Sequence, residues 1–254
     1  MRHVPTLLRR ELGAYFLGPM AYLILLAFQV IAWLNFWQLV EFLALPQNEF
    51  SGLRDPMNTY ISGSAPFWIA LLVAVPALTM RLIAEERRSG TIEGLLTAPV
   101  TETEVVLAKW LAGVLMFWAL LLPFALYLPV LRYVGRYYFD VGPLWALAIG
   151  LTTIGMMFVA VGLFFSALTR NQIIAAIGTF AVLFLIVLMT SLLYQFAVDR
   201  KAEWAEGVRF SALLFQVHAF GAGQLDLRYL AMHLSVAAFM LFLTVKVLQL
   251  RQGK

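Results

Sequence analysis

The run VVLAKWLAGVLMFWALLLPFALYLPVL, residues 105–131, contains a single charged residue, Lys109. A helix needs about 20 apolar residues to cross a hydrocarbon core of roughly 30 Å. Runs of similar length and character occur at residues 20–40, 66–84, 144–168, 173–194 and 229–248. The sequence therefore predicts an all-α integral membrane protein with six transmembrane helices, forming one transmembrane domain over residues 1–254.

The overall composition supports this fold class. Of the 254 residues, 62% are hydrophobic, and the mean hydropathy is +0.85, whereas ordinary soluble domains contain about 45–50% apolar residues. The absence of cysteine excludes disulfides and thiolate metal sites. The formal net charge of +4 does not by itself indicate a nucleic-acid partner, because basic loops of membrane proteins usually record orientation.

The distribution of basic residues predicts the orientation of the chain. An even number of spans places both termini on one side of the membrane. With these six spans, eleven Lys and Arg lie on the side of the termini and seven on the other. Because cytoplasmic loops carry the excess of basic residues, we expect a multi-pass protein of the inner (cytoplasmic) membrane with both termini in the cytoplasm.

An amphipathic helix precedes the first span, at residues 3–16. Arg9 and Arg10 lie on its polar side, opposite an apolar side formed by Val4, Leu7, Leu8, Leu12, Tyr15 and Phe16. Such a helix is typical of one that lies in the membrane interface with its basic face toward headgroups. Glu11 falls within the apolar side. It is either a side chain that snorkels or lies on a frayed helix tip, or the partner of a nearby basic group.

Residues 195–226, before the last span, alternate charged and apolar patches and are too long for a tight turn. We expect this segment to re-enter the outer membrane interface. In the fourth span, small residues recur along one face at Ala148, Gly155, Gly162 and Ser166. Small residues let membrane helices approach closely, which favours packing within the chain, with self-association as the alternative.

Ionisable residues are scarce inside the predicted spans. His233 is the only one well inside, while Arg81, Lys109 and Lys246 are close enough to the ends for snorkelling to be expected. Carriers driven by ion gradients use buried charged residues as relays or coordination sites. We therefore expect no ion-driven transport by this chain alone, and we favour a hydrogen-bonded His233 over a proton site.

The chain also contains none of the familiar catalytic motifs. It has no G-x-x-x-x-G-K-[ST] phosphate loop, no G-x-S-x-G, no H-E-x-x-H and no cluster of His, Asp and Glu. No soluble stretch is large enough for a nucleotide-binding domain. We therefore expect no catalytic or metal site and no cofactor in this chain, and we do not expect an enzyme.

The densest charge of the chain lies between the second and third spans, in RLIAEERRSGTIEGLLTAPV, residues 81–100. Gly90 is expected to end a short charged helix, after which residues 91–97 can form a short helix with an apolar stripe of Ile92, Leu95 and Leu96. A solvated loop needs no apolar stripe, and acidic residues do not help orientation. An apolar face with a charged rim is typical of a docking surface. The alternative is a solvated loop that only sets orientation.

Three stretches resemble a known family. PALTMRLIAEERRSGTIEGLLTAPVTETEVVLAK, residues 76–109, resembles the loop between the second and third spans of ABC-2 type ABC transporter permeases. It is most similar to the GldF-like (gliding-motility-associated) and NosY-like branch. RRELGAYFLGPMAYLILLAF, residues 9–28, and FSALLFQVHAFGAGQLDLRYLAMHLS, residues 210–235, are similar to the entry and exit segments of that branch. Leu213–Leu214 and 221–223 depart from its more polar pattern.

The resemblance implies a six-helix permease that couples ATP hydrolysis to export or transbilayer movement of a substrate. It implies two copies of a separately encoded ABC ATPase, which would hold ATP and Mg, and a second permease copy or a related permease. The loop at residues 84–100 would sit in a cleft of the ATPase. The coupling residues would be Glu85, Glu86, Arg87, Arg88, Gly90, Thr91, Ile92, Glu93, Leu95 and Leu96.

Two functions of other classes compete with this one. The first is a membrane anchor for a mechanically acting ATPase, with no solute transported. The second is an intramembrane enzyme acting on lipid, which would need convergent polar residues, whereas Gln29, Asn35 and Gln38 lie on different faces of the first span. A vesicle transport assay separates the first alternative from a transporter.

Overall fold

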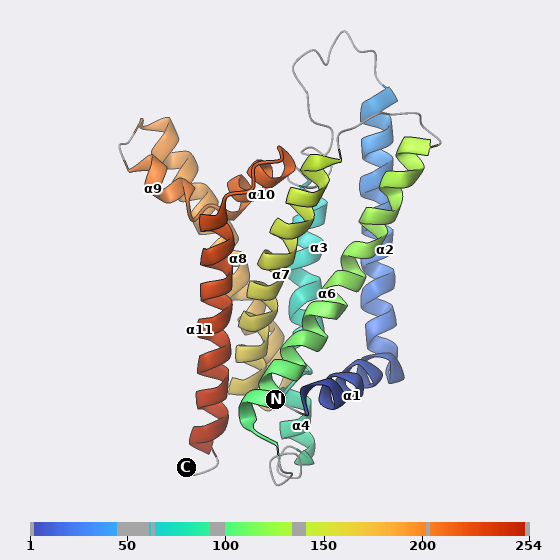
Figure 1. Cartoon of the computed structure of the whole chain (residues 1–254), viewed down its shortest axis with the longest axis vertical. Helices are drawn as coiled ribbons and strands as arrows, with labels where there is room; N and C mark the ends of the chain where they lie inside the picture. Colours follow the sequence, from blue (N-terminus) through green and yellow to red (C-terminus); the bar gives the residue numbers. More distant parts are fainter. Residues whose placement is uncertain are drawn as a thin grey trace.

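The computed structural model of the chain describes residues 3–44, 61, 64–91, 100–133, 141–201 and 204–251. Within these ranges, six helices are long and apolar enough to cross a membrane, which confirms the predicted fold class. The long helices run side by side along the length of the molecule (Figure 1). The N- and C-terminal ends of the chain both lie at one end of this bundle (Figure 1).

The bounds of the helices give the architecture. In chain order they are α1 Val4–Leu17, α2 Pro19–Ala44, α3 Ala65–Thr79, α4 Ala84–Ser89, α6 Glu102–Tyr133, α7 Gly142–Leu168, α8 Gln172–Asp199, α9 Ala205–Arg209, α10 Leu213–Gly221 and α11 Leu227–Arg251. The helix α1 lies across the end of the bundle that holds α4 and the termini, and α9 and α10 lie at the opposite end (Figure 1).

Local sequence signals explain several helix starts. At the start of α6, the Thr101 N–H donates to Glu104 Oε2 over 3.2 Å, and the Glu104 N–H donates to Thr101 Oγ1 over 3.3 Å. This is the reciprocal capping box that the spacing of Thr101 and Glu104 predicts. At the start of α8, Asn171 Oδ1 accepts the Ile173 N–H over 2.9 Å. Free backbone donors at these helix ends are thereby satisfied.

Two helices form the centre of the bundle. The apolar windows of the spans that contain α3 and α7 are 78% and 72% buried, against 22% or less for α2, α8 and α11. The glycines of α7 permit this close packing. A Cβ atom on Gly155 would lie 2.3 Å from the Phe117 ring, and one on Gly162 would lie 2.1 Å from Thr79 Oγ1. The predicted use of these small residues for packing within the chain is confirmed at both positions.

The second span differs from the continuous helix expected at residues 66–84. The helix α3 ends at Thr79, turns follow over residues 80–83, and α4 begins at Ala84. Pro76 lies in the last turn of α3 and supplies no backbone N–H to the helix. The break turns the start of the 84–100 loop toward the neighbouring helices, where its backbone groups find partners from another span.

Candidate functional site at the base of the 84–100 loop

Ser166 of α7 holds the break between α3 and α4. Its Oγ accepts the N–H groups of Ile83 and Ala84, each over 3.0 Å, and donates to the carbonyl oxygen of Met80 over 3.0 Å. A serine hydroxyl offers one donor and two acceptor lone pairs, and all three are used here. Because Ser166 is fully buried, no water competes for these bonds, and the start of α4 is fixed to α7.

Arg87 adds a second attachment of α4 to α7. This side chain is buried, and its Nη1 donates to the carbonyl oxygen of Ala167 in the last turn of α7. The last carbonyls of a helix have no partner within the helix and carry partial negative charge. A guanidinium placed there satisfies one of them, so Arg87 and Ser166 together bind α4 to one end of α7.

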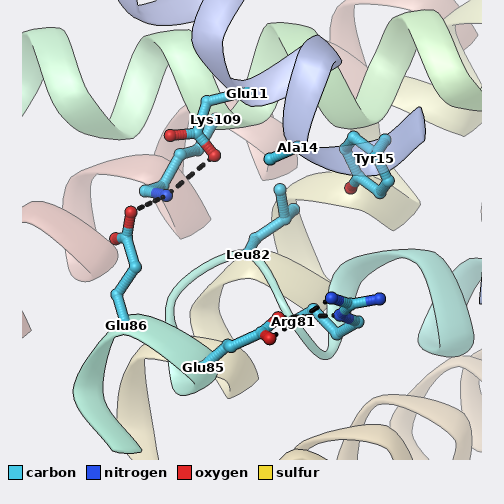
Figure 2. A pocket seen from close by; sticks show the side chains of 8 residues that line it. All are labelled: Glu11, Ala14, Tyr15, Arg81, Leu82, Glu85, Glu86 and Lys109. Atoms are coloured by element: carbon cyan, nitrogen blue, oxygen red, sulfur yellow. Dashed lines mark hydrogen bonds and ion pairs between the residues drawn. The ribbon is translucent and has the colours of Figure 1, made fainter. Parts of the chain in front are cut away.

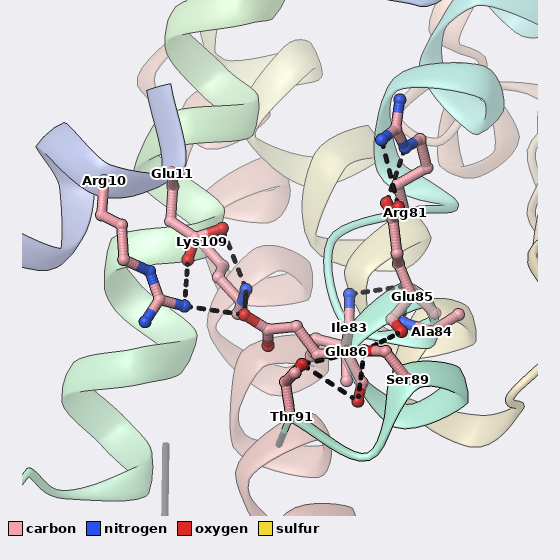
Figure 3. Close-up of polar contacts among 11 residues, drawn as sticks. Arg10, Glu11, Arg81, Ile83, Ala84, Glu85, Glu86, Ser89, Thr91 and Lys109 are labelled. Atoms are coloured by element: carbon pink, nitrogen blue, oxygen red, sulfur yellow. Dashed lines mark hydrogen bonds and ion pairs between the residues drawn. The ribbon is translucent and has the colours of Figure 1, made fainter. Parts of the chain in front are cut away.

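A cluster of four charged side chains joins α4 to α1 and α6 (Figure 3). Lys109 of α6 is 1% exposed, and its Nζ lies 2.9 Å from Glu11 Oε2 and 2.9 Å from Glu86 Oε1. Arg10 Nη2 lies 2.8 Å from Glu86 Oε1 and 3.2 Å from Glu11 Oε1. We call these residues, Arg10, Glu11, Glu86 and Lys109, the charge cluster. Its two acids and two bases leave no net charge to bury.

The charge cluster settles two expectations about single residues. The prediction that Lys109 snorkels is wrong, because its ammonium group turns into the protein, where two carboxylates replace water as its partners. A buried charge is tolerated when it is paired and hydrogen-bonded. Glu11 is accordingly the partner of a nearby basic group, which was one of its two interpretations, and the snorkelling alternative is wrong.

A cavity of about 200 Å³ lies beside the charge cluster (Figure 2). On its other side, Arg81 Nε lies 2.7 Å from Glu85 Oε2 in a partly exposed ion pair. Tyr15 also lines the cavity, and its hydroxyl donates to the carbonyl oxygen of Leu78 over 2.9 Å. Burial, and then the negative charge of Glu11, raise the pKa of the Tyr15 hydroxyl, against a smaller opposing effect of Arg81. This hydroxyl therefore stays a donor.

A second buried polar group lies away from this site. His233 of α11 is fully buried, with Nδ1 3.0 Å from Thr153 Oγ1 and Nε2 2.8 Å from Gln216 Oε1. The Gln216 amide in turn donates to the carbonyl oxygen of Phe210. These bonds join α7, α10 and α11, and they confirm the prediction of a hydrogen-bonded histidine. Within the described ranges, no group of three or more His, Cys, Asp and Glu residues could hold a metal ion.

Comparison with known proteins identifies the family. A family model described as an ABC-2 family transporter protein matches residues 43–245. The chain belongs to this family. It is a multi-pass membrane subunit of an ABC transporter, and permeases of this family normally work with a separate ABC ATPase. No curated protein matches the chain significantly.

In this ABC-2 permease, the predicted coupling residues occupy different environments. Glu85 pairs with Arg81. Glu86 and Arg87 contact other helices of this chain, and Arg88 is exposed. The residues at the end of α4 follow the sequence signal: Gly90 has φ 75° in the left-handed region, which favours glycine. Thr91 Oγ1 donates to the Glu86 carbonyl oxygen over 3.4 Å. Ile92, Glu93, Leu95 and Leu96 lie outside the described residues.

The predicted residues of the interfacial helix also separate into two groups. Arg9 is exposed, whereas Arg10 and Glu11 belong to the charge cluster. Sequence reasoning did not find Lys109 or Ser166 as part of the site. The signal for Lys109 was present, because an isolated lysine in an apolar run and an isolated glutamate in an apolar helix face can neutralise each other. Ser166 was recognised only as a small residue.

Proposed function

We propose that this chain is the permease subunit of an ATP-binding cassette transporter and that residues 84–100 are its coupling element. The family match over residues 43–245 supports the class. The observation that carries the coupling role is the attachment of α4. Ser166 and Arg87 bind it to α7, and Glu86 binds it to α1 and α6. A force applied to the loop therefore has a direct route into three other helices.

The partners follow from this assignment. We infer two copies of an ABC ATPase, which hold ATP and Mg, and two permease subunits that form the translocation path. The end of the bundle with α1, α4 and both chain ends (Figure 1) would face the cytoplasm. The exposed side chains of Arg9 and Arg88 at this end support that orientation. The membrane here would be the inner membrane.

The branch of the family is a finer proposal. The similarity of residues 76–109 to GldF-like and NosY-like permeases supports this branch. The same similarity is compatible with a second function, a membrane anchor for an ATPase that acts mechanically. Both functions need the coupling element. Reconstitution in vesicles separates them, because only a transporter moves lipid or solute when ATP is supplied to the ATPase.

The coupling role is tested with Leu95→Asp, which places a charge in the predicted apolar stripe. The same substitution at Leu225, an exposed residue between α10 and α11, is the control. Burial of one leucine contributes about 1.5–3 kcal/mol. Leu95→Asp should therefore weaken binding to the ATPase roughly tenfold or more, measured with the ATPase that co-purifies from native membranes. Wild-type binding by Leu95→Asp would contradict the coupling role.

A further inference from the structure

We propose that Glu86 is a releasable latch between α4 and the pair α1 and α6, and that movement of the coupling element opens it. This inference rests on the proposed function, because the ATPase supplies the movement. The geometry separates a fixed point from a releasable one. Ser166 binds the backbone at Ile83 and Ala84, where α4 begins, whereas Glu86 reaches across to Lys109 and Arg10. A rotation of α4 about its two attachments to α7, through Ser166 and Arg87, would withdraw Glu86 while both attachments remain.

The charges are arranged so that this withdrawal leaves Lys109 paired. Lys109 Nζ lies 2.9 Å from Glu11 Oε2, so Lys109 keeps this partner when Glu86 leaves, and the two side chains are 2% and 10% exposed. The remaining excess charge falls on Arg10, whose side chain is 53% exposed and can be solvated. A buried charge becomes very costly only when it loses its last partner. The charge cluster therefore avoids that cost in the open state.

Glu86 itself is incompletely satisfied in the closed state. Its Oε2 atom is buried and has no hydrogen-bond partner within the described part of the chain, whereas Oε1 contacts both Lys109 and Arg10. A buried acceptor without a partner opposes the state that contains it. Release would return this oxygen to water, which offsets part of the lost ion pairing. The closed contact is thus less stable than two fully hydrogen-bonded ion pairs would make it.

The alternative is that Glu86 is a permanent brace. The absence of cysteine from the chain allows a permanent brace and a releasable latch to be distinguished by cross-linking. The test variant is Arg10→Cys/Glu86→Cys, which spans the proposed latch. The control is Glu11→Cys/Lys109→Cys, which spans the contact between α1 and α6 that stays closed. Each double variant removes one acid and one base, so the net charge of the cluster remains zero in both.

The experiment uses the permease–ATPase complex in lipid nanodiscs and a short, reducible bifunctional thiol reagent. Without nucleotide, both pairs should cross-link. With ATP and a hydrolysis-deficient ATPase, cross-linking of the Arg10→Cys/Glu86→Cys pair should fall several-fold, and the control pair should not change. With active ATPase, cross-linking the latch pair should abolish most ATP hydrolysis until the reagent is reduced. Cross-linking the control pair should leave the hydrolysis rate at the level of the same variant before cross-linking.

The outcomes separate the latch from the proposed function. Equal cross-linking of the latch pair with and without ATP, in a complex that still binds and hydrolyses ATP, would overturn the latch alone. Failure of the wild-type chain to bind any ABC ATPase would overturn the proposed function and the latch with it. If ATP reduced cross-linking of both pairs equally, α1 and α6 would also separate, and the latch would be wrong as stated.

Discussion

Glu11 of α1 and Lys109 of α6 form an ion pair 98 residues apart in sequence, with their Oε2 and Nζ atoms separated by 2.9 Å. Both side chains are at least nine-tenths buried. An amphipathic helix at the end of the bundle thereby contributes a counterion to the interior of a span. The helix α1 is therefore part of the packed structure as well as a predicted membrane contact.

Replacing Lys109 should be strongly destabilising. Lys109→Met leaves two carboxylates with Arg10 as their one basic partner in the charge cluster, so one negative charge is uncompensated. Loss of one partner of a buried ion pair costs about 3–5 kcal/mol. Glu11→Gln should cost less, because Lys109 keeps Glu86. The measurement is thermal unfolding of the purified protein in detergent. Lys246→Met, at an exposed position, is the control, and equal unfolding of the two lysine variants would contradict the prediction.

Removing the Ser166 hydroxyl should loosen the start of α4. Ser166→Ala leaves the buried N–H groups of Ile83 and Ala84 without this acceptor, and each unsatisfied group costs about 1–3 kcal/mol. We expect a loss of unfolding free energy of about 2–4 kcal/mol. Ser235→Ala is the matched control, because that exposed hydroxyl donates only within its own helix. If both variants unfold alike, Ser166 does not hold the break.

Alanine at two glycines should have opposite effects. At Gly162, a Cβ atom meets Thr79 of the central helix α3, and such overpacking costs about 1–3 kcal/mol. At Gly13 of α1, nothing lies within 4 Å of the added atom. Gly13→Ala should therefore stabilise the protein by about 0.4–1 kcal/mol through the unfolded chain. Thermal unfolding of the two variants tests this, and a stabilising Gly162→Ala would refute the packing argument.

Tyr15 should make stability fall at alkaline pH. Its raised pKa means that the folded protein holds the phenolic proton more tightly than the unfolded chain does. Its contribution is fully present below the ordinary value of 10.0 and is lost as the pH rises above it. Tyr15→Phe should cost about 1 kcal/mol at pH 7 and show a shallower alkaline decline. Tyr22→Phe, at an exposed position, should retain the wild-type profile, measured by unfolding at a series of pH values.

Features that depend on residues close together in the sequence were predictable from the sequence. The apolar runs gave six spans, and the three-residue spacing of Thr101 and Glu104 gave the capping box. The left-handed conformation at Gly90 follows from the same kind of local signal. Each of these features depends on the length, composition and backbone geometry of one segment alone, so it can be read from that segment of the sequence.

Features that depend on which helix face meets another were not predictable. Charge alone placed Arg87 on a rim for a partner, but α4 turns it toward the last carbonyls of α7. Ser166 was noted for its size, and its role comes from a hydroxyl that meets a break more than 80 residues away. Lys109 was expected to reach water because no single segment shows that its counterions come from two others.

The order of the charge cluster along the chain matters for membrane insertion. Arg10, Glu11 and Glu86 all precede Lys109, so the ribosome delivers both carboxylates before the span that carries the lysine. That span would enter the bilayer with its counterions already made. A truncation that deleted α1 would do more than shorten the protein, because the nascent third span would then arrive with half of its neutralising charge missing.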